Sequence, residues 1–250
     1  MAKKSDGRMQ QALEVFARGF CCTQSFTHPY LAERVESVWA VADAPRKRGD
    51  YRREEWIAHG VAPREMDRIA REHTRGHFAL CAIHACDEEE RVIREEFKEL
   101  GYRLNATEAF MVHDLKRIPR VTAPVEIVRV LDQDMARRLN KTAGRRQVLD
   151  EHLTKDAPLR QYVACVDGEH VGWVRSIHLD CGTWCSDMWV QPAFRRRGIA
   201  RAMLCRMLRD DRAAGAERAV LTASHSGAKL YPLVGYKEIG TLMLYTPKKR

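Results

Sequence analysis

The sequence predicts an α/β fold with a mixed central sheet flanked by helices, most clearly in its C-terminal half. Segments with strand character alternate there with amphipathic helical segments, and a basic loop containing glycine joins a strand to a helix at 191–198. Residues 117–124 carry two prolines without clear periodicity, which is typical of a connection between domains. We therefore expect one domain at residues 1–120 and a second at residues 121–250.

The C-terminal domain is expected to begin with a strand and two helices. Val125 to Leu131 has the composition of a strand. Asp132 is a suitable N-cap for a helix through Asn140, because its carboxylate can accept from first-turn N–H groups. Residues 146–153 predict a second, short helix.

A hairpin and a third strand come next. The runs 161–166 and 171–177 are rich in Val, Tyr and Trp, and Asp167-Gly168 between them favours a two-residue turn. Residues 183–190 predict the third strand. Gly198 opens an amphipathic helix, and a strand, a short helix ended by Gly235 and a last strand follow at 219–223, 226–234 and 238–245.

The loop after the third strand has the features of an anion site. It contains Arg195-Arg-Arg-Gly198 and leads directly into a helix. The first N–H groups of a helix are unpaired and attract negative charge, and the arginines add charge suited to a diphosphate. Ala200 keeps the first helical turn narrow.

This stretch resembles the acetyl-CoA signature of the GCN5-related N-acetyltransferases (GNAT), which is [Arg/Gln]-x-x-Gly-x-[Gly/Ala] after a strand ending Val-x-Pro. Arg195, Gly198 and Ala200 fill the signature. Tyr231-Pro-Leu-Val-Gly235-Tyr236 resembles the closing motif of the same family. The resemblance covers residues 121–247 and implies the GNAT fold, with acetyl-CoA as co-substrate and no metal.

The resemblance also implies where acetyl-CoA binds. Its pantetheine arm would lie between two splayed strands, 183–190 and 219–223. Two serines stand where the family commonly has an asparagine that holds this arm. The residues expected to bind acetyl-CoA are Met188, Trp189, Val190, Arg195, Arg196, Arg197, Gly198, Ile199, Ala200, Arg201, Ser224 and Ser226.

Two residues are expected to be catalytic. By resemblance, Tyr231 donates a proton to the leaving thiolate, which a well-placed phenol can do. Asp187 is the carboxylate in the third strand and the candidate general base, although strict alternation would turn it away from the amine unless a bulge intervenes. His152, His178 and His225 are the alternatives for the base.

The N-terminal half contains an echo of these motifs. Residues 41–51 match the spacing of 190–200, and Phe97-x-x-x-Gly101-Tyr102 matches the closing motif. These matches predict a degenerate partial copy of the GNAT fold, with chance similarity as the alternative. We expect no second coenzyme site there, because Asp50 and Tyr51 spoil the loop and Phe97 has no hydroxyl.

Composition limits the partners. The net charge of +9 favours an anionic partner, and acetyl-CoA meets that need, so we do not expect nucleic acid. No segment predicts a membrane span or a signal peptide, which favours a cytoplasmic protein with eight free cysteines and no metal.

We therefore expect an N-acetyltransferase that acts by direct attack on a primary amine of a small molecule or a protein. The alternative is a module on the same fold that senses coenzyme A or contacts nucleic acid without turnover. A homodimer is left open.

Overall fold

The computed structural model describes residues 2–24, 28–47, 49–86 and 90–248. The chain forms two compact units. The first comprises residues 1–111, 222–226 and 238–250, and the second comprises residues 112–221 and 227–237. The last strand thus belongs with the N-terminal half, whereas the predicted boundary after residue 120 would leave it in the C-terminal domain. The domain boundary after residue 120 remains a prediction.

The first unit is built on a mixed sheet in the order β1-β2-β3-β4-β11-β5. Its strands are β1 (Leu31–Val35), β2 (Val38–Ala42), β3 (Glu54–His59), β4 (Phe78–Ala85), β5 (Tyr102–His113) and β11 (Lys237–Pro247). β3 and β4 are parallel, and β11 is antiparallel to β4. Met243 and Tyr245 of β11 are fully buried in the core of this unit, beside Trp56.

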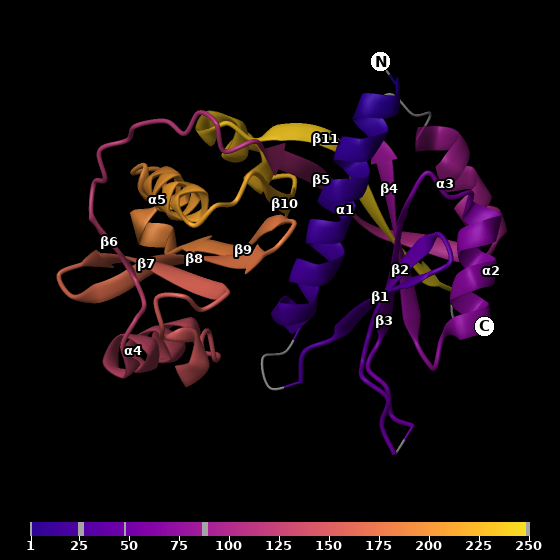
Figure 1. Ribbon diagram of the computed structural model, residues 1–250, viewed down its shortest axis with the longest axis horizontal. Coiled ribbons are helices and arrows are strands. Elements are labelled where there is room, and N and C mark those ends of the chain that lie inside the picture. Colours follow the sequence, from indigo (N-terminus) through magenta and orange to yellow (C-terminus); the bar gives the residue numbers. More distant parts are fainter. Residues whose placement is uncertain (1, 25–27, 48, 87–89, 249–250) are drawn as a thin grey trace. The chain divides into compact units, whose positions relative to one another are not determined.

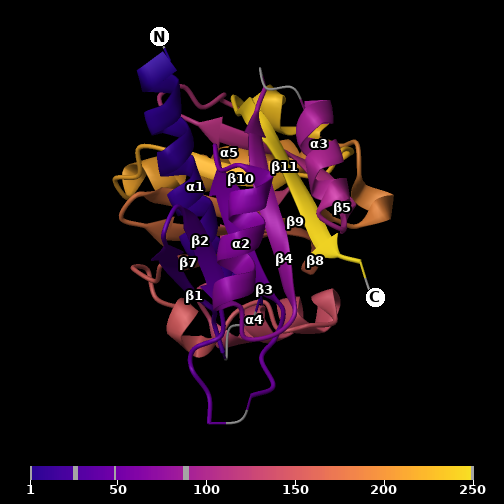
Figure 2. The same ribbon diagram turned by 90° about the vertical axis from the view of Figure 1, so that its right-hand side faces the viewer.

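Three helices cover this sheet. α1 (Ala2–Gln24) lies on one face, and α2 (Pro63–His73) and α3 (Glu90–Glu99) lie on the other (Figure 1), side by side in the view of Figure 2. α1 was not predicted from the sequence. Met9, Leu13 and Phe16 are buried at helical spacing, and this periodicity is visible in the sequence.

The second unit has its own run of strands, β10-β9-β8-β7-β6. They are β6 (Glu126–Arg129), β7 (Leu159–Val166), β8 (Glu169–Leu179), β9 (Gly182–Val190) and β10 (Ala219–Ala223). α5 (Ile199–Ala213) covers one face and α4 (Gln133–Ala143) the other (Figure 1). The α/β class with a mixed sheet is therefore confirmed, as is the Asp132 cap, which accepts from Met135 N at 2.8 Å.

Two predicted helices are wrong in detail. Residues 146–153 form only the 3-10 turn η1 (Asp150–His152), because Gly144 ends α4 in the left-handed region and Gln147 N donates to the Asn140 side chain. Residues 226–234 form two 3-10 turns, η3 (Gly227–Lys229) and η4 (Tyr231–Val234). Gly235 ends η4 with φ +106°, as predicted for a glycine C-cap.

The predicted correspondence of residues 41–51 with the basic loop is wrong, although Arg48 lies outside the described residues. After 41–51 the chain enters the strand β3, not a helix. The element that matches β9-α5-β10 is β3-α2-β4, since both join parallel strands through a helix. Its loop is Gly60-Val-Ala62, which contains no arginine.

In the described part of the chain, no helix combines the length and the apolar character needed to cross a bilayer.

Candidate active site

The loop between β9 and α5 exposes backbone N–H groups. After the 3-10 turn η2 (Pro192–Phe194), Arg196 and Gly198 adopt positive φ values of +65° and +79°. Gly198 is the N-cap of α5, and the first turn of α5 contains no acidic residue. Left-handed residues before an open helix start form a concave anion site. An added Cβ at Gly198 would meet nothing within 4 Å, so the backbone conformation favours glycine there.

The three predicted arginines differ in their contacts. Arg195 donates from Nε to the carbonyl of Val190 at 2.9 Å, which ties its side chain to the end of β9. The Arg197 guanidinium lies 5.3 Å from the centre of the Phe194 ring. All three arginines are exposed. The loop therefore presents three cations beside the start of α5, and the Nε atom of Arg195 is bonded to β9.

A bulge interrupts β9 at the candidate base. Trp173 pairs with Trp189 and Arg175 pairs with Ser186, so Asp187 and Met188 together oppose Val174. Asp187 has φ +56°. A bulge breaks strict alternation and leaves one residue unpaired. The orientation of Asp187 therefore could not follow from counting residues along the strand.

β9 and β10 are paired over a short stretch. The register joins Ala219 with Thr183 and Val220 with Trp184. Residues 186–189 of β9 are half-buried. The Trp173 and Trp189 rings stack at 4.3 Å across β8 and β9, which fixes the strand beside the bulge. This part of β9 can offer its backbone to an extended ligand.

Asp187 is held by two arginines that sequence analysis missed. Arg145 forms an ion pair with Oδ1, and Arg175 lies 3.4 Å from Oδ2. Arg175 is only 4% exposed and also donates to Gln161 and to the side chain of Gln147. A buried charge requires such polar partners. Through them Arg175 connects the segment after α4, which contains Gln147, with Asp187 in the bulge of β9. Arg175 could have been noticed in the sequence, because it is a single arginine within the hydrophobic run 171–177.

Tyr231 begins η4 and is 8% exposed. η4 packs against α5, the helix that follows the basic loop. The Tyr231 and Tyr236 rings meet edge to face, with centroids 5.7 Å apart. Tyr231, β9, the loop and α5 all belong to the second unit.

The remaining predicted residues are distributed differently. Ser224, His225 and Ser226 belong to the first unit, where the Ser224 and Ser226 hydroxyls lie 3.3 Å apart. His178 pairs with Thr183, at the end of β9 opposite to Val190. His152 lies in η1, and burial lowers its pKa. The roles of these residues remain predictions.

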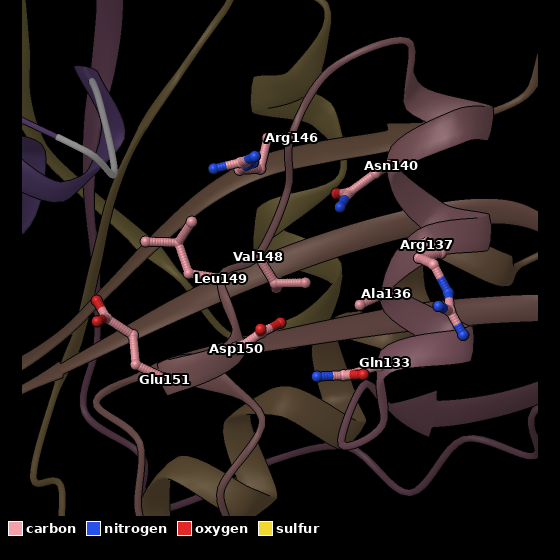
Figure 3. Close-up of a pocket in the computed structure, with 9 residues that line it drawn as sticks. All are labelled: Gln133, Ala136, Arg137, Asn140, Arg146, Val148, Leu149, Asp150 and Glu151. Atoms are coloured by element: carbon pink, nitrogen blue, oxygen red, sulfur yellow. The ribbon is translucent and has the colours of Figure 1, made fainter.

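A pocket of about 520 Å³ lies between α4 and residues 146–151 (Figure 3). Ala136 and Val148 are buried at its base, and Gln133 and Asp150 face each other across it. The other lining residues are Arg137, Asn140, Arg146, Leu149 and Glu151. The pocket thus offers both carboxylates and guanidinium groups to a ligand.

One described group of side chains has the spacing of a metal site, in the first unit. It consists of Glu36, Glu72 and His73, all exposed. Arg68 donates to both carboxylates at 2.6 Å. These oxygens therefore already have a cationic partner.

Residues 158–238 match the family model described as acetyltransferase (GNAT) domain. The chain is similar to a GCN5-related N-acetyltransferase from Kribbella flavida, with a TM-score of 0.65, 14% identity and 96% of each chain covered. It is also similar to a GCN5-related N-acetyltransferase from Sphaerobacter thermophilus, with a TM-score of 0.56, 17% identity and coverage of 82% of this chain and 75% of that one. No curated protein matches the sequence. At these identities the structural likeness shows the fold, and it extends through the N-terminal half.

Proposed function

We propose that the protein transfers the acetyl group of acetyl-CoA to a primary amine of a small molecule or a protein. The match of residues 158–238 to the model of the acetyltransferase (GNAT) domain supports this proposal. The observation that carries the proposal is the loop before α5. Arg196 and Gly198 in left-handed conformations, the open helix start and the arginines together fit a diphosphate.

The residues of β9 would hold the rest of the coenzyme. We assign backbone groups of Met188, Trp189 and Val190 to the pantetheine arm, since β9 and β10 are paired only near their starts. Arg201 and the first-turn N–H groups of Ile199 and Ala200 complete the diphosphate site. Ser224 and Ser226 are assigned to the arm on the sequence resemblance alone.

Acetyl-CoA supplies a thioester carbonyl carbon, which the amine nitrogen attacks directly. Backbone N–H groups at the Asp187–Met188 bulge stabilise the oxyanion. Tyr231 donates its phenolic proton to the sulfur as the C–S bond breaks. Burial raises the pKa of the Cys185 thiol on β9, which argues against a thiolate that forms an acetylated enzyme.

Asp187 accepts the proton that the amine loses. Its Oδ1 is occupied by Arg145, whose side chain is 64% exposed, so this role requires Arg145 to move away. The pocket beside α4 is the proposed acceptor site. Asp150 and Glu151 line this pocket and can form ion pairs with an ammonium group of the acceptor. They lie on the same segment as Gln147, whose side chain accepts a hydrogen bond from Arg175.

Release of free coenzyme A thiol in the presence of a panel of amines tests this function. We expect release that depends on both an amine and acetyl-CoA. Tight binding of acetyl-CoA without release for any small amine or lysine-containing peptide would favour a sensing module instead.

A further inference from the structure

We propose that His113 is a positioning residue for Tyr231, which it reaches through the end of η4. The inference rests on the proposed function, in which Tyr231 is the proton donor. His113 is the last residue of β5 and belongs with η4 to the second unit. The two segments are more than a hundred residues apart in the sequence, and neither motif in the sequence pointed to this histidine.

Two hydrogen bonds fix the ring of His113. Leu115 N donates to Nδ1 at 2.8 Å, so Nδ1 is unprotonated and Nε2 carries the hydrogen. Nε2 then donates to the carbonyl of Val234 at 3.0 Å. The ring is 1% exposed, and burial lowers its pKa, which favours this neutral form. His113 therefore holds the last carbonyl of η4 in one place.

Gly235 leaves room for this ring. A Cβ at Gly235 would lie 2.7 Å from His113 Nε2, which is closer than real Cβ contacts, and 3.2 Å from Cδ2, which is a tight contact. The φ of +106° also disfavours a side chain there. The imidazole thus occupies the space that any side chain at the end of η4 would need.

The same contacts reach Tyr231. The Tyr236 ring packs edge to face against both Tyr231 and His113. The centroids of the His113 and Tyr236 rings lie 5.3 Å apart, with an interplanar angle of 71°. Tyr236 N also donates to the Tyr231 carbonyl at 3.2 Å. A four-residue 3-10 turn has little stability of its own, so its position depends on such contacts. His113 holds both the end of the turn and the ring beside the phenol.

Two substitutions separate the two bonds. His113→Asn keeps an oxygen that can accept from Leu115 N but has no donor at the place of Nε2. His113→Gln places an amide nitrogen near Nε2. We expect His113→Asn to lower kcat about tenfold with little change in the KM for acetyl-CoA, because a misplaced proton donor affects the chemical step. His113→Gln should recover most of that loss.

A double substitution tests the link to the phenol. In a Tyr231→Phe background, His113→Asn should cause little further loss, because no proton donor remains to be placed. If the two losses multiply in full, His113 acts independently of Tyr231 and the inference fails. If Tyr231→Phe alone has normal turnover, the assigned role of Tyr231 fails, and the inference fails with it.

Hydrogen exchange gives a measurement that does not need turnover. In His113→Asn, the amides of Gly235 and Tyr236, which bond to Pro232 and Tyr231, should lose protection while those of α5 keep theirs. Unchanged protection at both amides would overturn the inference, as would equal loss throughout the unit. His59→Asn is the matched control, since His59 contacts the Ile83 carbonyl in the first unit and should leave kcat unchanged.

Discussion

A single hydroxyl group is the sharpest test of the proposed chemistry at the scale of one residue. Tyr231→Phe removes the proton donor but keeps the ring that packs against Tyr236. We expect turnover to fall by about 10²-fold, within the range for general acid catalysis, with unchanged affinity for acetyl-CoA. Single-turnover kinetics and calorimetry measure the two quantities. Normal turnover when chemistry is rate-limiting would return Tyr231 to a packing role.

Gly198 allows charge and conformation to be separated. Asn tolerates the left-handed region, so Gly198→Asn tests the conformation, and Gly198→Asp adds a negative charge of nearly the same shape. Asp at the start of α5 would repel a diphosphate. We expect acetyl-CoA to bind Gly198→Asp about tenfold or more weakly than Gly198→Asn, as measured by calorimetry. Equal affinities in two folded variants would contradict the assignment of the loop.

At the scale of one helix, Asp211 makes the stability of α5 against the sheet depend on pH. Its carboxylate is fully buried, accepts from Ser176 Oγ at 2.8 Å, and lies 3.5 Å from Arg160. Burial raises its pKa to about 6 from the usual 3.8. The folded state therefore favours the protonated form, so this contribution is complete below pH 3.8 and is lost as pH rises through 6.

Asp211→Asn should remove this dependence. Between pH 4 and pH 8 the free energy of unfolding of the variant should gain about 2.5 kcal/mol relative to the unchanged protein. Denaturant unfolding at several pH values measures the difference. Asp210→Asn is the control for the loss of a carboxylate on this helix, because Asp210 forms a partly exposed ion pair with Arg206. A constant difference across this range would show that Asp211 is not the titrating group.

The elements that the sequence predicted are those with local causes. Asp132 caps α4, and Asp167-Gly168 turns the hairpin with two positive φ values. Residues 146–149 look helical in isolation, but Gln147 bonds to Asn140 and Arg175 across the fold. The basic loop before α5, the strand β9 and Tyr231 were predicted from sequence motifs. The bulge at Asp187 depends on the pairing of β8 with β9, which the sequence of one strand does not reveal.

At the scale of the whole molecule, the closing strand belongs to the fold of the first unit. β11 pairs with β4 from Gly240↔Ala85 to Tyr245↔Leu80. Gly240 is required there because a Cβ would lie 2.3 Å from the His84 carbonyl oxygen. A chain shortened to residues 121–250 would keep β11 without β4. Experiments on the coenzyme site therefore need the full chain.

One chain should bind one molecule of acetyl-CoA. The first unit repeats the β-α-β arrangement, but its loop has only Gly60-Val-Ala62 between strand and helix. Pro63 removes one of the free N–H groups of α2, and Glu65 places a negative charge in the first turn beside Arg64. The short loop, Pro63 and Glu65 each make the binding of a diphosphate at the start of α2 unfavourable.

Calorimetric titration of the full chain should thus give one equivalent of acetyl-CoA. Gly198→Asp serves as the companion variant, because weakening the site in the second unit should leave no tight binding elsewhere. Two equivalents in the unchanged protein would refute the single site. Tight binding that persists in Gly198→Asp would show that the loop before α5 is not the coenzyme site.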